Sequence, residues 1–117
     1  MGSGVESSRA FQRIFMSTTV LITGASKGLG RATALFFATK GWNVIASMRS
    51  TEKETELTCH ENVLIVRLDV EDAASIDSAV LEAMENVGRM DVLINNAGFG
   101  QYGLFEALTP EQISEAI

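Results

Sequence analysis

The sequence predicts an α/β domain with a doubly wound parallel sheet. Short apolar runs alternate with stretches of helical periodicity, and these runs are apolar at nearly every position, as in strands covered on both faces. A chain of 117 residues forms one domain at most. Right-handed crossovers give the strand order third, second, first, fourth. The ligand crevice is expected at the carboxyl ends of the first and fourth strands, where the direction of winding reverses.

The chain is expected to begin with a segment that stays outside the fold. Residues 1–17 are rich in Gly and Ser and show no periodicity, so we expect a disordered leader there. Their scattered basic and apolar residues faintly resemble a targeting peptide, but the short length and Glu6 favour disorder. The domain is therefore expected over residues 18–117.

Each element of the first half has its own sequence signal. Residues 19–23 form a β-branched apolar run that ends in a glycine cluster, which predicts a strand followed by a loop. Apolar residues then recur at helical spacing over 29–40, and Gly41 supplies the left-handed stop of a helix. A second strand is predicted over 43–48, and the polar stretch 51–57 predicts a short helix.

The second half continues the alternation. The runs 63–69 and 91–95 predict the third and fourth strands. Between them, a helix that starts near Asp72 and ends at Gly88 is indicated by apolar residues on one face: Ile76, Val80, Ala83 and Val87. Thr109 is followed by Pro110 and, two residues later, by Gln112. A Thr at the N-cap with Pro at the first and Gln at the third helical position predicts a capping box, and therefore the start of a last helix.

Composition excludes several function classes. The net charge of −6 is unevenly spread, because Glu6 is the only acid of the first fifty residues and the remainder is strongly acidic. An anionic ligand is therefore expected to meet the first half, whereas the acidic total disfavours nucleic acid. The sequence has one cysteine, Cys59, and one histidine, His60, so neither a disulfide framework nor a metal site is expected. No apolar stretch has the ~18–20 residues of a membrane span, which indicates a cytoplasmic protein without membrane contact.

The glycine cluster is the first candidate site. Gly24, Gly28 and Gly30 follow the pattern Gly-x-x-x-Gly-x-Gly in a strand-to-helix turn, where backbone N–H groups and the helix dipole favour a phosphate. A P-loop is disfavoured, because Leu29 stands where its lysine would be. The glycines alone fit tight packing of helix against sheet equally well.

Two motifs together resemble one family. Residues 23–30 read TGASKGLG and residues 95–98 read NNAG, which is similar to the N-terminal, cofactor-binding half of the short-chain dehydrogenase/reductase family. The resemblance runs from residue 18 to residue 117. It implies a Rossmann fold, binding of NAD or NADP, and interconversion of carbonyl and hydroxyl groups by hydride transfer.

The resemblance also implies roles for individual residues. Gly24 would make the tight turn, Gly28 would let the backbone approach the pyrophosphate, and Gly30 would allow close contact of helix and strand. Further loop contacts would come from Ser26, Lys27 and Leu29. Asp69 would bind the adenine amino group together with the backbone of Val70, although a carboxylate there equally suits a cap of the next helix. The adenosine ribose would lie against Asn96, Ala97 and Gly98.

The residues after the second strand indicate which cofactor is preferred. NAD-specific sites place an acid there to accept from the ribose hydroxyls, but residues 48–50 contain none. Arg49 offers a planar charged fork for a 2′-phosphate, within reach of Lys27. We therefore predict NADP rather than NAD, with a solvated Arg49 as the alternative. Residues 99–105 would line the crevice mouth, or form an ordinary glycine-rich loop.

The family's catalytic pair has no counterpart in the chain. That pair is a Tyr with a Lys four residues later, but Tyr102 is followed at this spacing by Glu106. No catalytic residue is therefore assigned, and the sheet is expected to be truncated after the fourth strand, which would leave an apolar edge. The resemblance implies an oxidoreductase acting on a small carbonyl or alcohol, homo-oligomeric at full length and inactive as this chain alone. The alternatives are a non-catalytic dinucleotide-binding module and an inactive truncated fragment.

Overall fold

A computed structural model describes residues 18–52, 54–96, 103–106 and 109–117, the third range for its backbone alone. The predicted leader, residues 1–17, lies outside the described residues. The strands are β1 (Thr19–Ile22), β2 (Asn43–Met48), β3 (Val63–Arg67), β4 (Val92–Asn95) and β5 (Gly103–Glu106). The helices are α2 (Gly28–Thr39), α3 (Ala73–Val87), α4 (Pro110–Ala116) and the 3-10 helix η1 (Leu57–Cys59).

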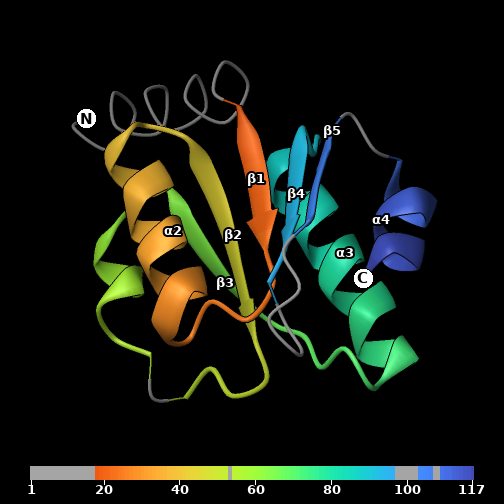
Figure 1. Cartoon of the computed structure of the whole chain (residues 1–117). Coiled ribbons are helices and arrows are strands. Elements are labelled where there is room, and N and C mark those ends of the chain that lie inside the picture. The colour runs from red at the N-terminus through yellow and green to blue at the C-terminus, as the bar shows by residue number, and fades with distance from the viewer. Residues whose placement is uncertain (1–17, 53, 97–102, 107–108) are drawn as a thin grey trace, which may run out of the picture.

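The strands form one five-stranded sheet in the order β3-β2-β1-β4-β5 (Figure 1). The first four strands are parallel, with Leu21 of β1 paired with Ile45 of β2 on one side and Leu93 of β4 on the other. The doubly wound parallel α/β fold and its predicted strand order are confirmed. Every residue of β1 and β2 is buried, which explains why these strands are continuous apolar runs.

The core has two halves, one on each face of the sheet. Because side chains alternate along a strand, Leu21 faces one half whereas Val20 and Ile22 face the other. The Leu21 half packs against α3 and α4, and the other half packs against α2 (Figure 1). The sheet is thus covered on both faces, and its strand ends remain the place where a ligand can reach the backbone.

Two predictions for elements were wrong. The described residues of the stretch 51–57 do not form the predicted helix, and only the 3-10 helix η1 begins at Leu57. The Glu54 carboxylate instead accepts from the Arg31 guanidinium and from the Leu57 N–H. The sheet also does not stop at the fourth strand. Part of the predicted loop 99–105 is the antiparallel strand β5, which pairs with β4 and covers the edge that we expected to be exposed. The rest of that loop, residues 99–102, lies outside the described residues.

The predicted helix ends are confirmed. Asp72 caps α3 by accepting from the N–H groups of its first turn, and α3 ends at Gly88 in the left-handed conformation. Thr109 begins α4 with the predicted capping box. Within the described part of the chain, no helix has the length and apolar character needed to cross a membrane. Nor do three or more potential metal-ligating side chains gather anywhere among these residues.

Candidate functional site

A cleft of about 760 Å³ opens at the carboxyl ends of the parallel strands. Its walls come from the loop between β1 and α2 and from the residues that follow β2, β3 and β4. The lining residues are Gly24, Ser26, Lys27, Gly28, Met48, Arg49, Leu68, Asp69, Val70, Glu71, Asn95, Asn96 and Ile117. Residues from distant parts of the sequence therefore meet at the predicted crevice.

Most of the predicted site residues lie in this cleft. Those that line it are Gly24, Ser26, Lys27, Gly28, Arg49, Asp69, Val70 and Asn96. Leu29 points elsewhere, with 62% of its surface exposed, and Gly30 is buried behind the loop. Ala97 and Gly98 lie outside the described residues.

The glycine loop is held open where a ligand could approach it. Gly24 and Gly28 have φ angles of 65° and 62°, a left-handed conformation that glycine adopts without strain. A Cβ added to Gly28 would find nothing within 4 Å. The loop is fixed to β2 by a hydrogen bond from the Ala25 N–H to the Ser47 carbonyl, at 2.9 Å. The Gly28 backbone is therefore both positioned and accessible.

Gly30 serves packing instead. A Cβ added there would lie 2.1 Å from the Gly24 carbonyl oxygen and 2.5 Å from Asn96 Nδ2, so only glycine fits. The Asn96 side-chain amide itself donates to the Gly24 carbonyl at 3.2 Å. The two interpretations of the glycine cluster thus apply to different glycines, with Gly30 closing helix against loop and Gly28 facing open space.

Hydrogen bonds join the ends of β1 and β4 beside the cleft. The Thr23 hydroxyl donates to Asn95 Oδ1 at 3.0 Å and accepts from the Asn96 N–H at 2.8 Å. The Asn95 side-chain amide also donates to the Ala116 carbonyl, at 2.9 Å. Asn95 was not among the predicted site residues, although its place in the Asn-Asn pair at a strand end was the available signal. It holds α4 against the strand ends.

The N-terminus of α2 differs from those of α3 and α4. No side chain caps it, and its first turn has no acidic residue. Asp72 and Thr109, in contrast, cap α3 and α4. The first N–H groups of α2 are thus left without a side-chain acceptor at the edge of the cleft, where Lys27 is the N-cap residue. Such an end favours an anion through its N–H groups and its dipole.

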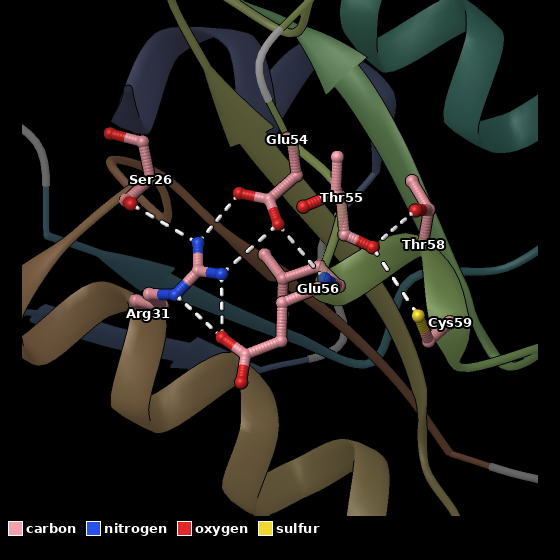
Figure 2. Close-up of polar contacts among 8 residues, drawn as sticks. Ser26, Arg31, Glu54, Thr55, Glu56, Thr58 and Cys59 are labelled. Carbon is pink, nitrogen blue, oxygen red and sulfur yellow. Dashed lines mark hydrogen bonds and ion pairs between the residues drawn. The ribbon is translucent and has the colours of Figure 1, made fainter.

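The basic residues near the cleft fall into two kinds. Lys27 and Arg49 are exposed on its walls, and neither forms an ion pair with any residue that the structure describes. Arg31, which sequence reasoning missed as a site residue, is instead bound by Glu54 and Glu56 (Figure 2). Its only sequence signal was its position on the helix that follows the glycine loop. Two positive charges therefore remain available to a ligand in the cleft.

Asp69 is positioned by a turn of its own. Its Oδ1 accepts from the Glu71 N–H at 3.0 Å, while its backbone N–H and carbonyl both bond the Ser75 hydroxyl. The helix cap that we considered for this residue belongs to Asp72. Asp69 thus presents a carboxylate at the cleft wall after β3, where it can accept from an amino group of a ligand.

Taken as a whole, the cleft offers a phosphate site at one wall and hydrogen-bonding groups at the other. Free helix N–H groups, an open Gly28 backbone and two positive side chains suit an elongated anion that carries phosphates. The carboxylate of Asp69 suits a base with an amino group. This combination fits a phosphorylated dinucleotide.

Comparisons with known proteins agree with the fold. A family model described as short chain dehydrogenase matches residues 18–117. An uncharacterised oxidoreductase of Schizosaccharomyces pombe is 42% identical over 96 residues, covering 82% of this chain and 32% of that protein. An NADPH-dependent pterin aldehyde reductase of Arabidopsis thaliana is 42% identical over 95 residues, covering 78% of this chain and 39% of the relative.

A solved structure described as ElxO with NADP bound is 36% identical to this chain and superposes with a TM-score of 0.65. The match covers 72% of this chain and 36% of ElxO. The chain thus spans only about a third of the length of the proteins that it resembles.

Proposed function

The chain belongs to the short-chain dehydrogenase family, and from this premise we propose that it forms the cofactor-binding part of an NADP-dependent oxidoreductase. The proposed reaction interconverts a carbonyl and a hydroxyl group by hydride transfer. The substrate would be a small carbonyl compound or alcohol, and the whole enzyme would be a cytoplasmic homo-oligomer. Residues 1–17 would remain outside the domain formed by residues 18–117.

One observation carries the proposed choice of cofactor. Arg49 follows β2 directly, lines the cleft, and has no carboxylate partner among the described residues. Residues 48–50 contain no acid, whereas NAD-specific sites place one after the second strand. The names of the Arabidopsis relative and of the ElxO structure, which mention NADPH and NADP, point the same way.

Each wall of the cleft has a proposed task. The N-terminus of α2 and the Gly28 backbone would bind the pyrophosphate, while Lys27 and Arg49 would bind the 2′-phosphate. On the other wall Asp69, with the Val70 backbone, would accept from the adenine amino group. Asn96, Ala97 and Gly98 would lie against the ribose, and Ser26 would complete the loop contacts. When bound, NADPH would supply a hydride, and the chain's own residues would hold the cofactor in place.

We assign no proton donor or acceptor for the reaction to this chain. Tyr102 is followed four residues later by Glu106, so no lysine is placed to lower the pKa of a tyrosine in the family's way. We therefore expect binding without turnover from the 117-residue chain.

Titration with both reduced cofactors tests the proposal. We expect NADPH to bind more tightly than NADH, as measured by the change in nicotinamide fluorescence. Replacing Arg49 by Met removes charge-assisted hydrogen bonds to the 2′-phosphate and should weaken NADPH binding about tenfold or more, with little effect on NADH.

The matched control is Arg67→Met. Arg67 is an equally exposed arginine at the end of β3 that does not line the cleft. R67M removes the same charge and should leave both dissociation constants unchanged. Equal or tighter binding of NADH by the unmodified chain would overturn the choice of NADP, and binding of neither cofactor would overturn the proposed function itself.

A further inference from the structure

The Arg31 guanidinium donates hydrogen bonds to Ser26 in the glycine loop and to Glu54 and Glu56 in the segment after β2 (Figure 2). Nη1 donates to Glu54 Oε1 at 2.6 Å and to the Ser26 carbonyl at 3.2 Å. Nη2 donates to Glu54 Oε2 at 3.2 Å and to Glu56 Oε1 at 2.6 Å, and Nε donates to the same Glu56 oxygen at 3.1 Å. These bonds use all five N–H donors of a guanidinium. Arg31 therefore has no donor left for a ligand.

The two carboxylates differ in how much they depend on Arg31. The Glu54 side chain is only 4% exposed and also accepts from the Leu57 N–H at 2.9 Å. Its hydrogen bond with Arg31 is the main reason that the pKa of Glu54 lies below its usual value. The Glu56 side chain is 60% exposed and reaches Arg31 from the surface. Without Arg31, a poorly solvated carboxylate and an exposed one would remain uncompensated.

This cluster adjoins the cleft on both sides of the proposed phosphate site. Ser26, whose carbonyl accepts from Arg31, lines the cleft beside Lys27. Glu54 and Glu56 lie on the connection that begins with Arg49, the other positive residue of the cleft. Arg31 thus joins the glycine loop to the segment that carries Arg49. Its single positive charge also offsets one of the two negative charges of Glu54 and Glu56, next to Ser26 on the cleft wall.

We propose that Arg31 is a positioning residue that sets the cofactor preference of this cleft without touching the cofactor. Its positive charge changes the net charge of the cluster with Glu54 and Glu56 from −2 to −1. This weakens a repulsion that would act more strongly on NADP, with its additional 2′-phosphate, than on NAD. The inference rests on the proposed function, because it assumes that the cleft binds a dinucleotide with its 2′-phosphate near Arg49. According to this inference, the preference for NADP depends on Arg31, which changes the charge around the 2′-phosphate, as well as on Arg49, which would contact it.

The test is the ratio of the dissociation constants for NADH and NADPH. Two unpaired carboxylates should repel the 2′-phosphate, so R31M should lower the preference for NADPH about fivefold. The triple variant R31M/E54Q/E56Q also removes both carboxylate charges, which leaves the cluster neutral, and should return the ratio to the original value or above it. Because the repulsion is electrostatic, the effect of R31M should shrink in ~1 M salt. A purely structural role for Arg31 predicts neither the rescue nor the salt dependence.

Arg89→Met is the control. Arg89 pairs with Asp91 at the amino end of β4, away from the cleft, so R89M breaks an ion pair and removes one charge without altering the ratio. Circular dichroism melts establish that each variant folds. If R31M does not fold, E54Q/E56Q replaces it, since the net charge of the cluster then changes from −1 to +1. Its preference for NADPH should rise about fivefold, and an unchanged ratio would overturn the role of Arg31.

The outcomes separate this inference from the function on which it rests. Binding by the unmodified chain with an unchanged ratio in R31M, or with no rescue in the triple variant, overturns the role of Arg31 alone. Absence of binding to the unmodified chain overturns the proposed function and this inference together. A lowered ratio that returns when Glu54 and Glu56 are neutralised supports both.

Discussion

Gly28 and Gly30 are two residues apart in one loop and face opposite surroundings. The space beyond Gly28 is empty to 4 Å, whereas the Gly24 carbonyl would lie 2.1 Å from a Cβ on Gly30. Spacing in the sequence marks both as glycine positions but does not distinguish their tasks. The difference arises because Asn96, from the end of β4, donates to the Gly24 carbonyl and fixes it over the helix.

Replacement of Gly30 by Ala tests this crowding. The clash is with backbone and with a hydrogen-bonded amide, so we expect G30A to lower the free energy of unfolding by about 3 kcal/mol. Gly41→Ala is the control, since Gly41 has a φ of 86° but nothing within 4 Å of an added Cβ. It should cost only about 1 kcal/mol, through backbone strain. Urea unfolding measures both, and equal costs would show that Gly30 is not crowded.

At the level of elements, the cap of α3 is a second measurable feature. Asp72 accepts from the Ala74 and Ser75 N–H groups, at 3.1 and 3.4 Å. Asp72→Ala should therefore lower the free energy of unfolding by about 1 kcal/mol. Asp77→Ala removes the same charge from an exposed position inside α3 and should have almost no effect. If D77A destabilises the chain as much as D72A, charge rather than capping is responsible.

The elements also show what the sequence could predict and why the rest escaped. Strands buried on both faces and the long amphipathic α3 carry a strong local pattern, so their places agree with the structure to within a residue or two. The prediction of a helix over 51–57 was wrong. In the structure the Glu54 carboxylate accepts a hydrogen bond from the Arg31 guanidinium. Its partner lies on α2, far away in sequence, and no local pattern could reveal it.

The site shows the same limit. Its glycine loop and the Asn-Asn pair were found, because short motifs carry their own spacing. Met48, Leu68 and Ile117 also line the cleft but have no such signal, because ordinary apolar residues reach it only through the way the strands end. Arg31 was missed for a similar reason, since its importance depends on two acids that the fold brings to it.

For the whole molecule, two ion pairs make stability depend on pH. Arg31 holds the pKa of Glu54 below its ordinary value of 4.5. Burial raises the pKa of Asp91, but hydrogen bonds from Arg89 and the Thr19 N–H outweigh it and leave the value below the ordinary 3.8. A carboxylate whose pKa is lowered in the folded state stabilises that state at pH values above the ordinary pKa of the group. That contribution is lost as the pH falls through the folded values.

We therefore expect the free energy of unfolding to fall as the pH is lowered below about 4.5, measured by urea unfolding at a series of pH values. E54Q and D91N should each flatten this decline, because the group that must take up a proton is gone. Glu85→Gln, on the exposed side of α3, is the control and should leave the slope as it was. A decline of equal slope in all four proteins would contradict the assignment to these pairs.

The pairing of β5 with β4 bears on the order in which the chain folds. Asn95 pairs with Gly103 a short distance along the chain, whereas Val20 must find Val92 across most of the domain. Contacts between near neighbours form sooner because less chain entropy is lost in closing the loop. We therefore expect β5 to cover the edge of β4 before β4 docks on β1 during folding. Any later strand that sought the same edge would have to displace β5 or add beyond it.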